Sequence, residues 1–316
     1  MRLISLVPTN TKINFLRFRK IAAVFSLILC VASAALFFTK GLNFGIDFRG
    51  GILIEVRTEG PANIGELRST LSGLGLGEVQ LQEFGQPSDV LIRIERQPGG
   101  EKAQLVAVEQ AKQALGNEVN YRRTEFVGPK VGGELIEAGV TAVLLALAAM
   151  LVYIWFRFEW QFGVGAVLAL LHDVVLTIGV FALLGLEFNL STVAAILTIA
   201  GYSINDTVVV YDRVRENLRK YKQMPLTDLL NLSINGTLSR TLLTSVTTLL
   251  ALSALYFFGG EVLAGFSFAM IWGVLVGTYS SIFIAVPLLV YMKLRRTGLI
   301  VGDTDDDEAA AGNANP

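Results

Sequence analysis

The stretch GYSINDTVVVYDRVREN, residues 201–217, decides how this chain is interpreted, because it places a carboxylate within an apolar helical run. The carboxylate belongs to Asp206, and basic residues follow shortly afterwards, from Arg213 onward. A charged aspartate near the middle of a membrane-spanning helix costs about 2.5–3.5 kcal/mol on insertion scales, and such residues usually lie on ion or proton pathways. Asp206 is therefore the first candidate for a functional residue.

The composition of the whole chain indicates an integral membrane protein. Of the 316 residues, 53% are hydrophobic and only 17% are charged, whereas a soluble domain has roughly 25% charged residues. The mean hydropathy is +0.56. The expected fold is an α-helical integral membrane protein that carries one small polar domain.

Six apolar segments are long enough to cross the hydrocarbon core, which needs about 20 helical residues. They lie near residues 21–38, 135–156, 162–185, 189–212, 238–258 and 263–292. The predicted organisation is an N-terminal tail (1–20), a first membrane helix (21–38), a polar domain (39–133), a five-helix membrane bundle (134–296) and a disordered acidic tail (297–316).

The distribution of basic residues predicts the orientation of these spans. Lys and Arg gather at 1–20, 213–222 and 293–296, and they are absent from the alternate short loops around Glu187 and Glu261. The positive-inside rule then predicts that both termini are cytoplasmic and that the polar domain lies on the external, periplasmic side.

The first apolar run has an alternative interpretation as a secretory signal peptide. Ala32-Ser33-Ala34 matches the small-residue pattern of a cleavage site, and basic residues precede the run. The apolar run continues to Phe38, however, and this length favours a retained membrane helix.

The polar domain alternates between strand and helix patterns. Alternating apolar and polar residues predict strands at 44–58, 78–84, 89–95 and 118–127, and helical spacing predicts helices from Pro61 and over 101–115. This β-α-β-β-α-β order is that of ferredoxin-like domains. Since no catalytic pattern occurs in it, we expect a binding or movable module, with a passive spacer as the alternative.

Asp206 shares one face of its helix with other polar residues. Thr198, Tyr202, Asn205 and Asp206 recur at helical spacing. A polar face of this kind is costly against lipid, so we expect it to face another helix or water.

The next span carries a second polar stripe, which offers a partner for Asp206. The stripe comprises Thr237, Arg240, Thr241, Thr244 and Thr248. Both Asp206 and Arg240 lie about 10 Å inside the membrane from the shared cytoplasmic side, at 1.5 Å per helical residue. An Asp206–Arg240 pair is therefore plausible as a proton-relay element, and a static ion pair or helix-packing stripe is the alternative.

His172 and Asp173 form a further candidate near the middle of the third span. Asp173 either relays protons or is a neutral, hydrogen-bonded group, and the sequence leaves both interpretations open. We group it with the supporting polar residues.

Motifs for enzymes, metals and cofactors are missing from the sequence. One histidine and one cysteine exclude His-rich metal sites and intrachain disulfides. The glycines at 73, 75 and 77 imitate a dinucleotide loop, but Glu78 stands where the third glycine belongs. We therefore expect no enzymatic activity, no metal and no cofactor.

Several separated motifs together resemble the SecF branch of the SecD/SecF family of protein-export membrane proteins. The motifs are GIDFRGG (45–51), GPKVG (128–132), RFE (157–159), LHD (171–173), GYSIND (201–206) with DRVREN (212–217), NGTLSRTLLTS (235–245) and GTYSS (277–281). The resemblance covers about residues 10–297, and the acidic tail lies outside it.

This resemblance implies one six-span half of a twelve-span assembly of the resistance–nodulation–division type in the bacterial inner membrane. It implies that Asp206 and Arg240 form the proton relay and that the proton motive force promotes late steps of export. It further implies SecD as heterodimeric partner, SecYEG with YidC-type and YajC-type accessory proteins as neighbours, unfolded exported polypeptides as cargo, and no nucleic acid.

Two other functions remain open from the sequence. Half of a proton-coupled small-molecule efflux transporter would carry a similar relay, although the polar domain is small for a substrate channel. A passive assembly scaffold would need no relay, which the polar stripes around Asp206 argue against.

Overall fold

The structure is a computed structural model that describes residues 11–116, 119–127, 129–292 and 294. The predicted acidic tail and the first ten residues of the predicted N-terminal tail lie outside these residues. The chain divides into two compact units. The sheet unit comprises Leu42–Leu145 and Gly185–Val193, and the helical unit comprises the remaining segments, up to Gly41, Ala146–Leu184 and from Ala194 onward.

Six helices in the described residues are long and apolar enough to cross a membrane, as predicted. The first is α1 (Arg19–Thr39), which continues a 3₁₀ turn, η1 (Phe15–Phe18). The next four are α5 (Pro129–Arg157), α6 (Trp160–Leu184), α7 (Leu190–Lys220) and α8 (Leu226–Phe258). The sixth runs from α9 (Glu261–Ser280) through a π-helical turn, η2 (Ser281–Ala285), into α10 (Val286–Tyr291).

The helix ends differ from the predicted spans on the basic side. The span predicted at 189–212 continues to Lys220, and the span predicted at 238–258 already begins at Leu226, directly after Pro225. The prediction followed hydrophobicity, which ends at the membrane surface, whereas backbone hydrogen bonding continues into polar sequence. Proline before the first turn fits a helix start, since the missing N–H is not needed there.

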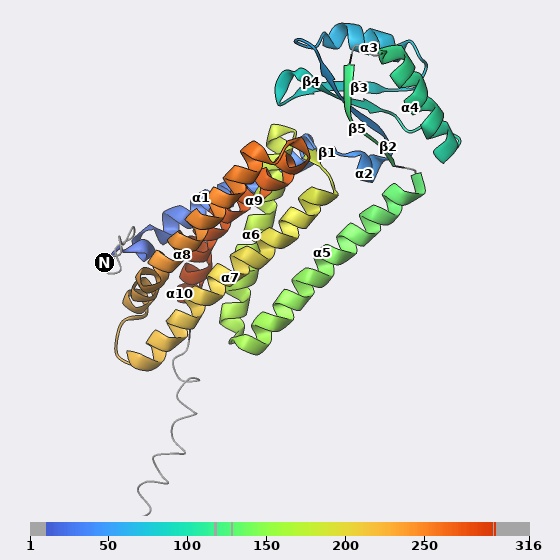
Figure 1. The fold of residues 1–316 in the computed structure, drawn as a ribbon. Helices are drawn as coiled ribbons and strands as arrows, with labels where there is room; N and C mark the ends of the chain where they lie inside the picture. The colour runs from blue at the N-terminus through green and yellow to red at the C-terminus, as the bar shows by residue number, and fades with distance from the viewer. Residues whose placement is uncertain (1–10, 117–118, 128, 293, 295–316) are drawn as a thin grey trace, which may run out of the picture. The chain divides into compact units, whose positions relative to one another are not determined.

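Close helix packing in the helical unit depends on small residues. A Cβ on Gly273 of α9 would collide with Ile199 of α7, and one on Gly179 of α6 would collide with Ser33 of α1. Small residues at such positions let membrane helices approach closely. Helix α6 packs against α1 and α9, and α9 also packs against α8 (Figure 1).

The sheet unit contains the predicted ferredoxin-like fold. Its four-stranded sheet has the order β3-β4-β2-β5, with every neighbouring pair antiparallel. The strands are β2 (Gly51–Thr58), β3 (Val79–Phe84), β4 (Gln86–Ile94) and β5 (Val119–Val127). Helices α3 (Ile64–Ser72) and α4 (Glu101–Leu115) pack on one face of this sheet, where the buried side chains form a single apolar core (Figure 1).

The prediction of one continuous strand over 44–58 is wrong. The segment forms a short strand, β1 (Asn43–Phe44), one helical turn, α2 (Ile46–Arg49), and then β2. The break falls at Gly50 and Gly51, with φ of 71° and 115°, which only glycine adopts readily. A Cβ on Gly51 would also lie 2.7 Å from the carbonyl oxygen of Ile94.

Strand β1 pairs instead with a distant segment. It runs parallel to β6 (Glu187–Phe188), which lies between α6 and α7. This pairing joins two parts of the sequence that no local pattern connects.

The other face of the sheet carries charged pairs. Arg57 of β2 and Asp89 of β4 are cross-strand partners, and Asp89 accepts hydrogen bonds from Nε and Nη2 of Arg57. Asp89 is only 2% exposed. The hydrogen bonds from Arg57 lower the pKa of Asp89 below its usual value.

Candidate functional site

Asp206 lies on α7 and is 4% exposed. Its Oδ2 atom is buried and has no hydrogen-bond partner among the described residues. A buried carboxylate oxygen without a donor is unfavourable, so it is a natural place to bind a proton or a donor supplied from elsewhere.

Arg240 lies on α8 and is exposed in the isolated chain. Its positive charge is close enough to act electrostatically on the Asp206 carboxylate. Among the ion pairs and hydrogen bonds of the described residues, none joins these two side chains. The structure thus brings the predicted relay residues into the same region without forming the direct pair, because the guanidinium remains at the surface of the chain.

Within the described residues, the other predicted residues of the α7 face form no hydrogen bonds to other helices. Thr198 and Asn205 are exposed, and the Thr198 hydroxyl donates to the carbonyl oxygen of Ala194 on its own helix at 2.8 Å. Tyr202 is partly buried, and its hydroxyl has no hydrogen-bond partner in the described part of the chain. The helices described here therefore leave much of this polar face uncovered.

The threonines of the α8 stripe mainly bond to their own helix. Thr237 is buried and donates to the carbonyl oxygens of Ser233 and Ile234, at 3.2 and 3.1 Å. Thr244 is exposed and donates to carbonyl oxygens one turn earlier. Thr241 is 2% exposed, and its hydroxyl lacks a partner among the residues described.

Asp173 forms the centre of a second polar cluster in the helical unit. It is fully buried, and its Oδ2 accepts hydrogen bonds from Ser203 Oγ at 2.5 Å and Ser280 Oγ at 2.8 Å. Its Oδ1 lies 2.9 Å from His172 Nδ1. The carboxylate thus ties α6 to both α7 and α9. Sequence reasoning found Asp173 and missed Ser203 and Ser280, since an uncharged serine in an apolar helix gives little signal.

The Asp173 cluster extends toward α1. The His172 ring lies 6.0 Å from that of Tyr279, and the Tyr279 hydroxyl is 3.0 Å from Ser26 Oγ. The Nε2 atom of His172 is buried, and the described residues offer it no hydrogen-bond partner.

A third link holds α7 farther along its length. The buried Tyr211 hydroxyl donates to the carbonyl oxygen of Ala285 at 2.9 Å. Ala285 ends the π-helical turn η2, and such turns leave carbonyl groups without their regular helical partner and recur at functional sites. Asp206 therefore lies between two anchored positions of α7, at Ser203 and Tyr211.

The described residues contain no group of three or more His, Cys, Asp or Glu side chains arranged to hold a metal ion. The chemistry available around Asp206 is therefore that of a single carboxylate and a nearby guanidinium. In general, a nearby opposite charge favours the ionised form of a carboxylate.

Comparisons with known proteins agree with the resemblance found in the sequence. Residues 107–295 match the family described as "Protein export membrane protein SecD/SecF, C-terminal", and residues 35–62 match the "SecD/SecF GG Motif". The chain is 49% identical over 288 residues to "Protein translocase subunit SecF" of Rickettsia bellii, covering 90% of this chain and 94% of that protein. The protein of the same name from Cereibacter sphaeroides is 46% identical over 304 residues, covering 93% of this chain and 94% of its own.

The fold also matches solved structures. The crystal structure of SecDF from Thermus thermophilus, described as a translocon-associated membrane protein, has a TM-score of 0.83 and 39% identity. A SecDF structure in a "Super-membrane-facing form" has a TM-score of 0.66 and 38% identity. The chain is covered to 92% and 93%, but it spans only 40% of either SecDF chain.

Proposed function

Because the chain belongs to the SecD/SecF family of protein-export membrane proteins, we propose that it acts as a SecF-type translocase subunit that uses the proton motive force to promote late steps of protein export. The observation that carries this proposal is Asp206, a buried membrane carboxylate without a hydrogen-bond partner in the described residues, within electrostatic range of Arg240. No metal or other cofactor enters the proposed cycle.

The partner is a SecD-type subunit, which supplies the other half of a twelve-span assembly. Two features support this part of the proposal. The chain corresponds to less than half of SecDF, and polar residues of two membrane helices are exposed in the isolated chain, namely Thr198, Asn205, Arg240 and Thr244. Polar groups facing lipid are costly, so a second set of helices that covers them stabilises the assembly.

The proposed setting follows from family membership and from charge. The assembly lies in the bacterial inner membrane beside SecYEG, with YidC-type and YajC-type accessory proteins, and it acts on unfolded exported polypeptides. The basic residues at 1–20, 213–222 and 293–296 support cytoplasmic termini.

The mechanism alternates between two charge states of Asp206. In the ionised state, the carboxylate attracts Arg240 and draws α8 toward α7. A proton that enters from the periplasmic side neutralises Asp206 and removes this attraction, so the packing of the two helices changes. Moving one charge through 100 mV supplies about 2.3 kcal/mol, and shifting a two-state equilibrium from 1:99 to 99:1 needs about 5.5 kcal/mol. About three protons that move through this potential are therefore sufficient for an almost complete conformational switch.

The test is export into membrane vesicles with and without an imposed proton gradient. Asp206→Asn is compared with Asp212→Asn, which neutralises an aspartate on the same helix. Asp212 is a suitable control because its side chain is 43% exposed and paired with Arg157 at 2.8 Å. We expect Asp206→Asn to lose the gradient-dependent part of export and Asp212→Asn to keep it.

Assembly with the partner is measured in the same membranes by co-purification. Undiminished gradient-dependent export in assembled Asp206→Asn would overturn the relay and favour a passive scaffold. Accumulation of small molecules in cells that lack the protein, with export intact, would instead favour the efflux function.

A further inference from the structure

The segment before the ferredoxin-like domain is joined to the loop that begins α7. Both belong to the sheet unit. Besides the β1–β6 pairing, Gly45 N donates to Phe188 O at 2.9 Å, and Asn43 Nδ2 donates to Gly185 O at 3.1 Å. The two segments therefore form one hydrogen-bonded piece although they are far apart in sequence.

Asp47 extends this connection to the helix itself. Its Oδ2 accepts a hydrogen bond at 2.8 Å from the backbone N–H of Leu190, the first residue of α7. The first N–H groups of a helix lack partners within the helix, and a carboxylate there also interacts favourably with the helix dipole. Asp47 is thus a capping group supplied by a residue outside the helix.

The same helix end has a local cap, which provides an internal comparison. Asn189 Oδ1 accepts a hydrogen bond from Thr192 N at 3.0 Å, within one turn of α7. A local cap stabilises the helix but connects it to nothing else. Asp47, in contrast, connects α7 to another part of the fold.

Arg93 connects the same region to the four-stranded sheet. Its Nη2 lies 2.5 Å from Glu187 Oε2, and its Nη1 donates to Asn43 Oδ1 at 3.0 Å. Arg93 therefore bridges β4 to both β1 and β6.

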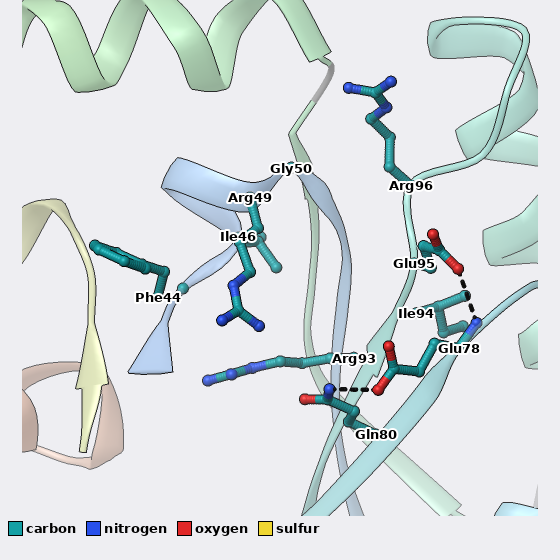
Figure 2. A pocket seen from close by; sticks show the side chains of 11 residues that line it. Phe44, Ile46, Arg49, Gly50, Glu78, Gln80, Arg93, Ile94, Glu95 and Arg96 are labelled. Atoms are coloured by element: carbon teal, nitrogen blue, oxygen red, sulfur yellow. Dashed lines mark hydrogen bonds between the residues drawn. The ribbon is translucent and has the colours of Figure 1, made fainter. Parts of the chain in front are cut away.

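The space around Arg93 shows that this region is not filled by continuous packing. A cavity of about 370 Å³ lies between the segment at 44–50 and strands β3 and β4, and Arg93 extends from β4 toward the segment that carries Phe44 (Figure 2). The polar contacts of Arg93 therefore span a gap at this place, beside the aromatic contacts that Phe188 makes with Phe44 and Phe48.

We propose that Asp47 is a positioning residue that couples the start of α7 to the sheet unit, with Arg93 as its second anchor. Leu190 and Asp206 belong to the same uninterrupted helix, so a displacement of α7 that follows protonation of Asp206 passes through the Asp47 cap. This inference rests on the proposed function, and it adds the residue through which the relay acts on the sheet unit.

The experiment removes either the acceptor or the donor of the Asp47–Leu190 hydrogen bond. It uses the full chain assembled with the SecD-type subunit. Asp47→Ala removes the acceptor. Leu190→Pro removes the donor at a position where proline is compatible with the helix, and Leu190→Ala controls for loss of the side chain. Asn189→Ala removes only the local cap.

The first measurement is the gradient-dependent part of export relative to the gradient-independent part. A lost hydrogen bond to a charged group corresponds to a loss of about tenfold or more, which we expect for Asp47→Ala and for Leu190→Pro. Asn189→Ala and Leu190→Ala keep the gradient response. Asp47→Ala and Leu190→Pro remove the same hydrogen bond. We therefore expect the double variant to lose no more of the gradient-dependent export than either single variant.

The second measurement is hydrogen exchange of residues 43–50 and 185–192, which reports on the connection itself. We expect faster exchange in both segments of Asp47→Ala. A full gradient response in Asp47→Ala with this faster exchange would overturn the inference, as would additive losses in the double variant. Unchanged export in Asp206→Asn, measured in parallel, would overturn the proposed function instead.

Discussion

Asp173 and Asp206 are both buried in apolar helices of the same unit, but their carboxylates have different surroundings. Asp173 accepts hydrogen bonds from Ser203 and Ser280 and lies beside His172 Nδ1. Asp206 has a buried oxygen without a partner among the described residues. Donors already satisfy the oxygens of the first carboxylate, whereas a buried oxygen without a donor is stabilised when a hydrogen-bond donor reaches it. From this comparison we expect Asp173 to hold the helices together and Asp206 to act in the proposed relay.

The largest expected effect on stability comes from removing the satisfied carboxylate. Asp173→Ala leaves the buried Ser203 hydroxyl without its acceptor, at a cost of about 1–3 kcal/mol, and Ser280 keeps only its longer bond to Gly277 O, at 3.2 Å. We expect a loss of about 3 kcal/mol, seen as a lower midpoint of thermal unfolding of the purified protein in detergent. The assembled protein should also become less abundant in the membrane.

Asp173→Asn sharpens this prediction. The amide oxygen still accepts hydrogen bonds from the two serines, so this variant should retain most of the stability. If Asp173→Asn were stable yet lacked the gradient response, Asp173 would belong to the relay and the proposed division of roles would be wrong.

The next largest effect on stability is expected at Asp89, a paired carboxylate in the four-stranded sheet. The bonds from Arg57 lower the pKa of Asp89, so the folded state binds the proton more weakly than the unfolded chain, whose aspartates titrate near pH 3.9. The pair therefore stabilises the sheet fully above that pH, and its contribution disappears as the pH falls through the lower pKa of the folded state.

We expect Asp89→Asn to lose about 1.5 kcal/mol at pH 7, at the low end for charged hydrogen bonds because Arg57 is partly exposed. Hydrogen exchange of β2 and β4 in the full chain measures this loss. The difference between variant and unmodified protein should vanish at low pH. A difference that persists there would mean that Asp89 acts through packing and not through its charge.

Local patterns in the sequence predicted the six spans and the β-α-β-β-α-β order, because hydrophobic periodicity is set by the helix or strand to which each residue belongs. They did not predict the break at Gly50 and Gly51, since it depends on pairing of β1 with a strand far along the chain. Ser203 and Ser280 escaped notice for the same reason. Their partner Asp173 is near them only after α6, α7 and α9 have packed.

The candidate relay shows the same limit. Helical spacing placed Asp206 and Arg240 on polar stripes at matched depth, but it could not give the conformation of a long side chain at the surface. That conformation depends on what covers α7 and α8, and the chain alone leaves Arg240 exposed.

A smaller effect is expected where α7 is anchored at Tyr211. Tyr211→Phe removes the hydrogen bond to Ala285 O and keeps the ring, so we expect a loss of about 1 kcal/mol in the free energy of unfolding. Thermal unfolding measures it, with Phe158→Leu as a control that alters the neighbouring aromatic packing and leaves the hydroxyl. An unchanged midpoint in Tyr211→Phe would show that the π-helical turn does not anchor α7.

The smallest effect on stability is expected at Asp206, and it separates the two aspartates most clearly. Asp206→Asn replaces a buried carboxylate that has no hydrogen-bond donor in the described residues with a neutral group of the same size. Removing an unsatisfied buried charge does not destabilise a fold, so the midpoint of thermal unfolding should stay the same or rise, by the equivalent of about 0.5 kcal/mol or less. A loss as large as that of Asp173→Ala would mean that Asp206 holds the helices together, and the loss of gradient-dependent export in Asp206→Asn would then follow from misfolding and not from a missing proton site.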